Sequence, residues 1–522
     1  MCGIFGSINS NAIRDTYKGL SRLEYRGYDS FGYAASNGET VEMVRQLGSV
    51  DESAFTGEYE SVIGHVRWAT NGEVTQENAH PQMCEGFYVV HNGVIENAPQ
   101  HMLDTKWLAN LIALCDGDAK EVYDKIDGDN AFVFLNSDTQ EVWCVAKGSK
   151  RLFITPNGYV SSDLNALSGF GNAAWVLENS HCTLQRDRLP YGSEAIRVPT
   201  EYKTNSPSGH KMLMEIEEQA NLHSNQWPSI KGDIDIIATG SSLYAAMFGA
   251  YALEQYRGIK ARCLHASQAR YRSLGKNPLA ISQSGETKDV INALKGVGNF
   301  RCITNNPYST LYDMSSSPIN MYAGPEEAVA ATKTFTMSCM KLCQSAGVSM
   351  GSMEPYIQDV LNRTDEIKGI ADRIIGYEHF LFLGDRQNYP IALEGALKFK
   401  EVAYVHAEGM PSSEMKHGPI ALVDHRVPSL FLVTEGFAPE TLSNIKEIKS
   451  RRGVVVVITH EEVEKHLLWD GVDMVFSCKD TGEQFSQSLL LNIVLQLLSY
   501  YIAVGRGINP DRPRNLAKCV TV

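Results

Sequence analysis

The sequence Ile281-Ser282-Gln283-Ser284-Gly285-Glu286-Thr287 lies between a short apolar run, 278–281, and a segment of helical character, 288–295. We interpret it as a strand-to-helix turn, the basic unit of an α/β fold. Its hydroxyls, its amide and the free backbone N–H groups at a helix start favour an anion. The turn has no lysine and no G-x-x-x-x-G-K-[ST] motif, so it is not a nucleotide P-loop. Taken alone, the stretch would be interpreted first as a Ser/Thr-rich capping turn.

Strands and helices are expected to alternate from Asp233 onward, which is typical of an open parallel sheet. An apolar run at 234–238 precedes Thr239-Gly240-Ser241-Ser242 and a helix expected from Tyr244. A second run at 379–383 precedes Gly384-Asp385-Arg386 and a helix through Lys400, so we predict an internal duplication. Ligands of such sheets bind at the carboxyl ends of the strands, where Ser242 and the 282–287 turn should lie.

Length and composition describe a soluble multidomain protein. The chain has 522 residues, 43% hydrophobic and 21% charged, with a net charge of −14 spread along it. This charge argues against nucleic acid as a partner. The longest apolar run, 489–504, is interrupted by polar residues and predicts a buried or subunit-facing helix rather than a membrane span. Eleven cysteines without CxxC or His/Cys clusters, and no evident signal peptide, predict a metal-free cytoplasmic protein.

Cys2 follows the initiator methionine. Removal of Met1 would place a thiol and an α-amine on one residue, and the amine titrates near pH 8, so it can serve as the base for the thiol. Many proteins begin Met-Cys by chance. Here, three motifs follow in order: Tyr25-Arg26-Gly27-Tyr28-Asp29-Ser30, Gly64-His65-Val66-Arg67-Trp68-Ala69-Thr70 and Val90-His91-Asn92-Gly93.

At these motifs the chain resembles the class II glutamine amidotransferases, which are N-terminal-nucleophile glutaminases. The form Tyr-Arg-Gly-Tyr-Asp-Ser narrows the resemblance to the glutamine–fructose-6-phosphate aminotransferase (glucosamine-6-phosphate synthase) family. The resemblance implies an αββα glutaminase domain followed by two doubly wound parallel-sheet SIS domains. It implies that Cys2 attacks the glutamine amide and that Asn92 and Gly93 form the oxyanion hole. It further implies glutamine-binding and gating roles for four residues: Arg67, Trp68, Thr70 and Asp104.

The chain departs from the family pattern at three positions. Asn71 stands where the family has His, Lys106 where it has Glu, and Ala331 where it has Ser. The 94–103 segment is also short. We expect Lys106 to weaken ammonium binding at Asp104, and Ala331 to remove one sugar contact.

Glu394, Lys398 and Glu401 are spaced by four and three residues, so a helix places them on one face. An exposed ion-pair stripe is the ordinary reading of such spacing. The surrounding sequence, 393–401, resembles the catalytic helix of the family. This implies that Glu401 moves a proton between C1 and C2 with help from Lys398, and that His417, donated by a neighbouring subunit of a homodimer, opens the sugar ring.

Two further segments carry the resemblance in the sugar half. Residues 329–333 are similar to a sugar-binding loop of the family, and residues 512–518 resemble its C-terminal tail, in which Lys518 would form a Schiff base with the ketose. A lysine near a C-terminus is otherwise a solvated charge. The implied sugar-phosphate contacts are Ser242, Ser282, Gln283, Ser284, Thr287, Val329 and Ala330.

We expect five segments: a glutaminase domain at 2–200, a linker and first helix at 201–228, SIS domains at 229–360 and 361–506, and a tail at 507–522. The predicted reaction takes glutamine and fructose 6-phosphate to glutamate and glucosamine 6-phosphate without cofactor or metal, passing ammonia between the sites. A sugar-phosphate isomerase with a weakened glutaminase, or a sugar-phosphate-binding regulator, is the alternative. The motifs of other class II amidotransferases are absent from the sequence.

Overall fold

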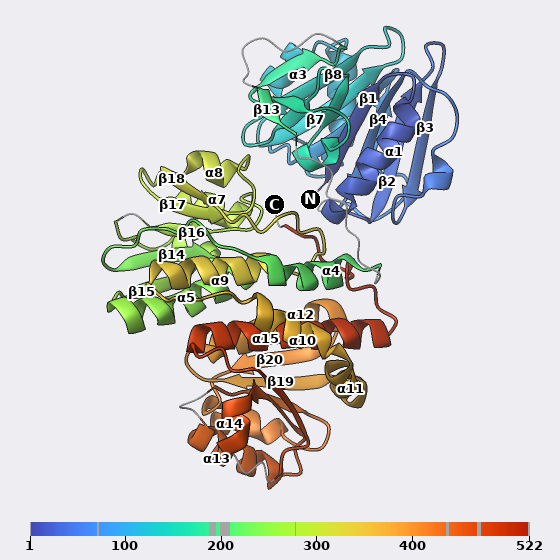
Figure 1. Cartoon of the computed structure of the whole chain (residues 1–522). Helices are drawn as coiled ribbons and strands as arrows, with labels where there is room; N and C mark the ends of the chain where they lie inside the picture. Colours follow the sequence, from blue (N-terminus) through green and yellow to red (C-terminus); the bar gives the residue numbers. More distant parts are fainter. Residues whose placement is uncertain are drawn as a thin grey trace. The chain divides into compact units, whose positions relative to one another are not determined.

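The computed structural model describes residues 2–69, 72–186, 195–198, 209–276, 278–434, 438–466 and 471–519. The chain divides into two compact units, whose main parts are residues 1–203 and 204–518. In Figure 1 the first unit runs from blue to cyan and the second from green to red.

Two antiparallel sheets form the core of the first unit. The larger has the strand order β13-β11-β9-β10-β1-β4-β2-β3 and the smaller β12-β8-β7-β6-β5. Side chains from both sheets, among them Ile4, Ile63, Val90 and Val133, pack into one buried cluster between them. The strands are β1 Gly3–Ile8, β2 Ser30–Ser36, β3 Val41–Leu47, β4 Ser61–Arg67, β5 Gln82–Cys84, β6 Phe87–Gly93, β7 Asn130–Asn136, β8 Val142–Lys147, β9 Leu152–Ile154, β10 Tyr159–Ser161, β11 Ala173–Leu177, β12 Ser180–Thr183 and β13 Ala195–Arg197.

Helices cover the outer faces of these two sheets. Helix α1 (Ala12–Leu23) contacts β1 and β4, while α2 (Asp104–Leu114) and α3 (Ala119–Lys125) contact the smaller sheet. Leu108 and Ile112 of α2 are buried against Phe132 and Phe134 of β7. The four layers confirm the predicted αββα fold, as Figure 1 shows.

Two parallel five-stranded sheets build the second unit. Their strand orders are β15-β14-β16-β17-β18 and β20-β19-β21-β22-β23. In each sheet the second strand along the chain lies on one side of the first strand, and the remaining three lie on the other side. The strands are β14 Ile234–Ala238, β15 Ala261–His265, β16 Leu279–Ile281, β17 Arg301–Thr304, β18 Ser317–Asn320, β19 His379–Gly384, β20 His406–Met410, β21 Ser429–Leu432, β22 Val455–His460 and β23 Met474–Cys478.

Alternate residues of these strands face opposite helical layers, which is why the strands read as continuous apolar runs. Ile236 and Ile281 join one cluster, and Ile237 and Ala280 join another on the opposite face. The helices are α4 Lys211–Glu217, α5 Ser241–Arg257, α6 Ala266–Ala269, α7 Lys288–Leu294, α8 Thr310–Met314, α9 Lys333–Ser345, α10 Glu354–Asn362, α11 Thr364–Ile374, α12 Asn388–Ala403, α13 Ala438–Lys449, α14 Glu461–His466 and α15 Gln484–Gly505.

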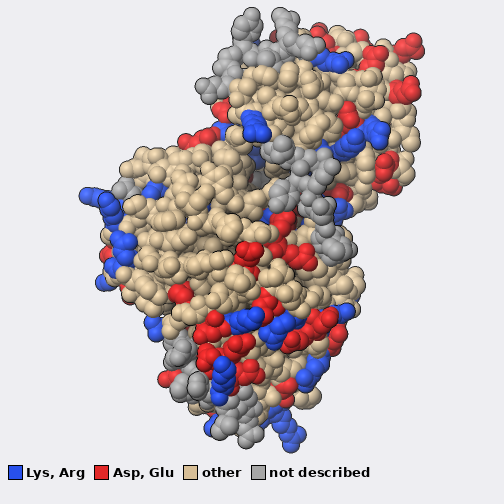
Figure 2. Space-filling view, in the orientation of Figure 1, with Lys and Arg blue, Asp and Glu red and all other residues tan. Residues whose placement is uncertain are grey.

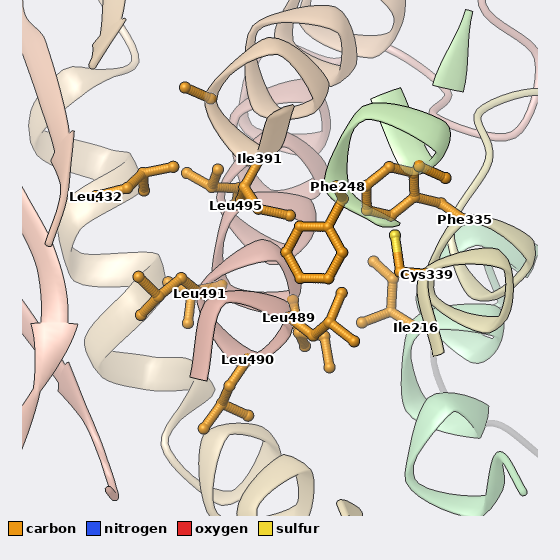
Figure 3. Packing of buried hydrophobic residues seen from close by; sticks show 14 of the residues in the cluster. Ile216, Phe248, Phe335, Cys339, Ile391, Leu432, Leu489, Leu490, Leu491 and Leu495 are labelled. Atoms are coloured by element: carbon orange, nitrogen blue, oxygen red, sulfur yellow. The ribbon is translucent and has the colours of Figure 1, made fainter. Parts of the chain in front are cut away.

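Helix α15 is the centre of the core in the second unit. Its leucines pack against Phe248 of α5, Phe335 of α9 and Ile391 of α12 (Figure 3). Its length and composition would allow it to cross a bilayer, but 83% of its most apolar window is buried within the protein, as in the core helix of a soluble domain. The prediction of a buried helix at 489–504 is confirmed.

The predicted duplication and its strands at 234–238 and 379–383 are confirmed. One boundary was wrong: α5 begins at Ser241 and not at Tyr244, because Gly240, with φ of +58°, lets the chain turn directly into the helix. Ser242 therefore lies in the first turn of α5. On the face shown in Figure 2, acidic and basic side chains are interspersed rather than gathered into one patch.

Candidate functional site

Cys2 lies beside the end of strand β4. It directly precedes β1, whose Gly3 pairs with Val66, and its Sγ lies 3.6 Å from the carbonyl oxygen of Trp68. The side chain is partly buried and the thiol is free. Antiparallel pairing of β1 with β4 thus brings the first residues of the chain next to the motif that contains Arg67.

Arg67 and Trp68 are the described residues at the end of β4 that lie near Cys2. Burial lowers the pKa of Arg67, while the nearby charges of Cys2, Asp29 and Asp104 act in the opposite direction. The Trp68 ring packs edge-on against Tyr28 at 5.8 Å between centroids. Asp29 accepts a hydrogen bond of 2.8 Å from the Ala69 N–H, which fixes the turn after β4. The predicted contact Thr70, and Asn71, lie outside the described residues.

Asn92 and Gly93 end strand β6, which packs against β1 and β4 from the opposite sheet. Asn92 is 5% exposed. A Cβ on Gly93 would collide with the carbonyl of Asp129, so the close approach of β7 by itself requires glycine there. The two predicted oxyanion donors therefore end a strand that packs against β1, the strand that Cys2 precedes.

Asp104 opens helix α2 and is mostly buried. Its Oδ2 lies 3.9 Å from Nδ1 of His91, and its Oδ1 accepts a 2.7 Å hydrogen bond from the Thr105 N–H. His91 lies on β6 directly before Asn92, so this contact links α2 to the strand that carries Asn92 and Gly93. Lys106 points elsewhere: its Nζ is 3.7 Å from Glu77, and both side chains are more than half exposed.

Arg26 and Asp163 were missed as site residues in the sequence. The Nε of Arg26 donates a 3.2 Å hydrogen bond to the carbonyl of Cys2, and its guanidinium pairs with Asp163. Tyr25 also hydrogen-bonds Asp163, and burial, followed by the charge on Asp163, raises the pKa of this tyrosine. Arg26 lies within a motif quoted above, but its partner Asp163 lies 137 residues further along the chain, so no local pattern indicates the pair.

In the second unit, the 282–287 turn joins β16 to α7 as predicted. Ser282 is buried and bonds both Thr287 Oγ1, at 2.9 Å, and the Gly285 N–H, at 3.1 Å. Gly285 has φ of +67°, and a Cβ there would collide with the Ser309 hydroxyl. Gln283, Ser284 and Thr287 remain partly exposed, so the turn presents polar groups at the sheet edge.

Glu394, Lys398 and Glu401 form a buried ion-pair set on α12. The Nζ of Lys398 lies 3.2 Å from Glu394 and 2.6 Å from Glu401, and Glu394 and Lys398 are fully buried. The exposed-stripe alternative is therefore wrong. Burial lowers the pKa of Lys398, but the two carboxylates more than offset this and raise it overall. Burial raises the pKa of Glu394.

Ser241 connects this set to the first sheet and was missed in the sequence. Its hydroxyl donates a 3.0 Å hydrogen bond to Glu394 and lies 3.4 Å from Lys398 Nζ. Ser241 follows β14, whose parallel neighbour β16 carries the 282–287 turn. Parallel strands end at one edge, so Ser241, which bonds Glu394 of α12, and the polar turn lie at the same edge of the first sheet.

Lys398→Met is expected to lower the free energy of unfolding of the second unit by about 3–5 kcal/mol, because it leaves two carboxylates without their buried cation. Chemical denaturation measures the change. Lys400→Met, an exposed lysine on the same helix, should change it by less than about 0.5 kcal/mol. Equal effects of the two substitutions would contradict this account of α12.

Lys518 is buried beside the loop that follows β18. Its Nζ lies 2.6 Å from Glu326 Oε2, and the two side chains are 4% and 0% exposed. Burial would raise the pKa of Glu326, but Lys518 and Thr334 lower it to about 2, so this carboxyl is ionised at neutral pH. Glu326 was missed because 192 residues separate it from Lys518. Val329 and Ala330 lie in the same loop, and the Val329 N–H bonds the tail at Asp511.

His417 lies apart from these groups. It ends a short 3-10 helix, Glu414–His417, and is exposed. Within the part of the chain that the structure describes, its side chain has no hydrogen bond or ion pair. The second unit thus contains two buried lysine–carboxylate sets, Lys398 with Glu394 and Glu401 and Lys518 with Glu326, and among the described residues His417 contacts neither.

Comparisons with known proteins agree with both units. The SIS-domain family matches residues 229–346 and 374–504. A glutamine–fructose-6-phosphate aminotransferase (isomerizing) of Methanosarcina acetivorans is 33% identical over 623 aligned positions, covering 100% of both chains. The protein of the same name from Aquifex aeolicus is 33% identical over 600 positions, again with complete coverage. Both alignments exceed the 522 residues of this chain, so they contain positions without a counterpart here.

Solved structures resemble the second unit. The C-terminal domain of glucosamine-fructose-6-phosphate aminotransferase from Francisella tularensis is 31% identical, with a TM-score of 0.56, and covers 60% of this chain and 100% of that one. Tagatose-6-phosphate ketose/aldose isomerase from Escherichia coli, at 15% identity and a TM-score of 0.51, covers 61% of this chain and 99% of its own and shares the fold alone. The full-length similarity and the two arrangements of residues lead to one conclusion: the chain belongs to the glutamine–fructose-6-phosphate aminotransferase (isomerizing) family.

Proposed function

We propose that this protein converts glutamine and fructose 6-phosphate into glutamate and glucosamine 6-phosphate. The observation that carries the proposal is that one chain, similar over its whole length to aminotransferases of that name, contains both a cysteine set and a buried lysine–carboxylate set. Incubation of the purified protein with both substrates tests it: glucosamine 6-phosphate should form, and its absence would overturn the proposal.

In the first unit we propose an N-terminal-nucleophile glutaminase. After loss of Met1, the Cys2 thiolate attacks the glutamine amide carbon, and the α-amine holds the displaced proton. Asn92 and the Gly93 N–H stabilise the oxyanion. Arg67 binds the substrate carboxylate, a role supported by its buried guanidinium beside Cys2. Asp104 binds the α-ammonium, and Lys106 leaves it free because the lysine pairs with Glu77.

The remaining substrate contacts of the first unit follow from the family resemblance. Thr70 binds glutamine, and Trp68 shields the ammonia that Cys2 chemistry releases. Collapse of the tetrahedral intermediate expels ammonia and leaves a thioester on Cys2, which water hydrolyses to glutamate.

In the second unit we propose that the sugar phosphate binds at the edge of the first parallel sheet. Ser242, Ser282, Gln283, Ser284 and Thr287 hold the phosphate end, and Val329 and Ala330 contact the sugar. The Lys518 amine, held 2.6 Å from Glu326, loses its proton to solvent, attacks C2 of the open ketose and releases water. Ammonia then displaces Lys518, and Glu401, beside Lys398, moves the proton from C1 to C2.

The net reaction balances without any oxidant. Fructose 6-phosphate gains NH₃ and loses H₂O, and the ketose becomes an aldose with nitrogen on C2. Ammonia passes between the two sites within the protein.

We further propose a cytoplasmic homodimer in which ring opening uses His417 of the partner subunit. The exposure of His417 supports a role outside its own subunit. Among the described residues no disulfide joins any of the eleven cysteines, which suits a reducing compartment. The proposed segments remain 2–200, 201–228, 229–360, 361–506 and 507–522.

Thr287→Val is expected to raise the KM for fructose 6-phosphate by about 10- to 100-fold, with kcat nearly unchanged, because it removes one hydrogen bond to a charged phosphate. Steady-state kinetics with saturating glutamine measures both constants. Thr481→Val removes a hydroxyl that bonds Glu483 before α15 and should leave KM unchanged. An unaltered KM in Thr287→Val would place the phosphate elsewhere.

A further inference from the structure

Helix α4 holds the loop that presents Glu326. Glu215, on this helix, is 5% exposed. Its Oε1 accepts hydrogen bonds from the backbone N–H groups of Glu327 and of Ala328, the latter at 3.1 Å. These N–H groups belong to the two residues that follow Glu326, so Glu215 fixes the backbone directly after Glu326.

The rest of the loop fixes the Glu326 carboxylate itself. Its Oε1 accepts from the N–H groups of Thr332 and Thr334, each at 3.0 Å. Its Oε2 accepts from the Thr334 hydroxyl at 2.7 Å and from Lys518 at 2.6 Å. The donors of Thr332 and Thr334 therefore hold both oxygens of this carboxylate and set its orientation toward Lys518.

The same helix holds the tail that carries Lys518. The two carboxylate oxygens of Asp511 accept hydrogen bonds from the N–H groups of Lys211, at 2.9 Å, and of Met212, at 2.8 Å. The carbonyl of Asp511 accepts from the Val329 N–H at 3.3 Å. Asp511 thus ties the tail both to the first turn of α4 and to the loop after Glu326.

Helix α4 is itself fixed in the core. Met212 and Ile216 are fully buried, and the helix packs against α15. Figure 3 shows Ile216 within the cluster around Phe335 and the α15 leucines. Because α4 is packed tightly in the core, it holds in fixed positions both the loop that carries Glu326 and the tail that carries Lys518.

We propose that α4 positions the reactive amine, with Glu215 acting from the loop side and Asp511 from the tail side to set Lys518 against Glu326. The inference rests on the proposed function, in which Lys518 bonds to the ketose. Both are positioning residues, since each acts through Glu326 or Lys518 rather than on the sugar. A small displacement of Lys518 from the carbonyl carbon would slow adduct formation steeply.

The charge of Glu215 is not what the loop requires. Burial, and next the charge on Glu326, raise the pKa of Glu215 to about 8, so its carboxyl is mostly protonated at neutral pH. Its Oε2 is buried and has no hydrogen-bond partner among the described residues. The substitution Glu215→Gln would therefore keep both the oxygen that accepts the two hydrogen bonds and the neutral state of the side chain.

The test measures trapping of Lys518 itself. Full-length protein is mixed with saturating fructose 6-phosphate and borohydride, and mass spectrometry follows reduction of the Lys518 adduct. Glu215→Ala and Asp511→Ala should each slow trapping by about tenfold or more, with little change in the fructose 6-phosphate concentration giving half the maximal rate. Glu215→Gln should trap within about threefold of the unaltered protein because it keeps the acceptor.

Glu483→Gln is the matched control. Both oxygens of Glu483 accept backbone N–H groups at the start of α15, at 3.0 and 2.6 Å, but it contacts neither the loop nor the tail. It should trap Lys518 at the normal rate. A normal rate in Asp511→Ala, or an equal loss in Glu483→Gln, would overturn the positioning role alone. Absence of any Lys518 adduct in the unaltered protein would overturn the proposed function and this inference with it.

Discussion

Cys2→Ala is expected to lower glutamine hydrolysis by at least about 10³-fold, because no other group supplies the nucleophile. Synthesis of glucosamine 6-phosphate from ammonium should continue, since Lys518 and Glu401 belong to the other unit. Glutamate release and amino sugar formation are measured side by side, with glutamine or ammonium as the nitrogen source.

Cys84→Ala is the matched control for this substitution. Cys84 is also a partly buried free thiol of the first unit, yet it lies on β5 and not before β1. It should hydrolyse glutamine normally. Glutaminase activity in Cys2→Ala would remove Cys2 from the mechanism, and an equal loss in Cys84→Ala would attribute the effect to the fold.

Lys518→Arg is expected to lower amino sugar formation from either nitrogen source by at least about 10³-fold, because a guanidinium stays protonated and does not form the imine. Arginine is chosen because it keeps a cation beside buried Glu326. Alanine would leave that carboxylate unpaired, at a cost of about 3–5 kcal/mol of stability, and would mix the two effects.

The measurement for Lys518→Arg is product formation together with borohydride trapping of the sugar. Lys479→Arg, an exposed lysine paired with Asp359 at 2.7 Å, should behave as the unaltered protein. Turnover by Lys518→Arg near the normal rate would show that the reaction does not pass through an imine on this residue. Glutaminase activity in the absence of sugar should be unchanged in both variants.

Much of the fold could be predicted from local patterns. The runs at 234–238 and 379–383 are strands whose burial on both faces makes their positions apolar except Asp235 and His379. The 282–287 turn could be placed because its glycine and hydroxyls mark a change from strand to helix. The spacing of Glu394, Lys398 and Glu401 places them on one helical face, as observed.

The partners of these residues could not be predicted from local patterns. The same spacing is typical of an exposed ion-pair stripe, and only the packing of α12 against α5 and α15 buries it. Ser241 reaches Glu394 across 153 residues, and Glu326 reaches Lys518 across 192. Such contacts depend on how separate elements pack, which no short stretch of sequence contains. Of the four site residues missed in this way, Arg26, Ser241 and Glu326 each contact a predicted one, and Asp163 pairs with Arg26.

The structure also bears on the two alternative functions. The alternative of a weakened glutaminase rests on Asn71, Lys106 and the short 94–103 segment. Of these, the Lys106 side chain pairs with Glu77 and not with Asp104. A non-catalytic regulator has no need for a fully buried lysine between two carboxylates, an arrangement that costs desolvation energy. Neither alternative is favoured by the similarity of the whole chain to aminotransferases.

The most direct test of the central claim is the stoichiometry of the two products. Purified protein is given glutamine and fructose 6-phosphate, and glutamate and glucosamine 6-phosphate are quantified over time. We predict that both form in a one-to-one ratio and that neither forms from glutamine in Cys2→Ala. Isomerisation of the sugar with glutamine left intact, or glutamate release without amino sugar, would contradict the account.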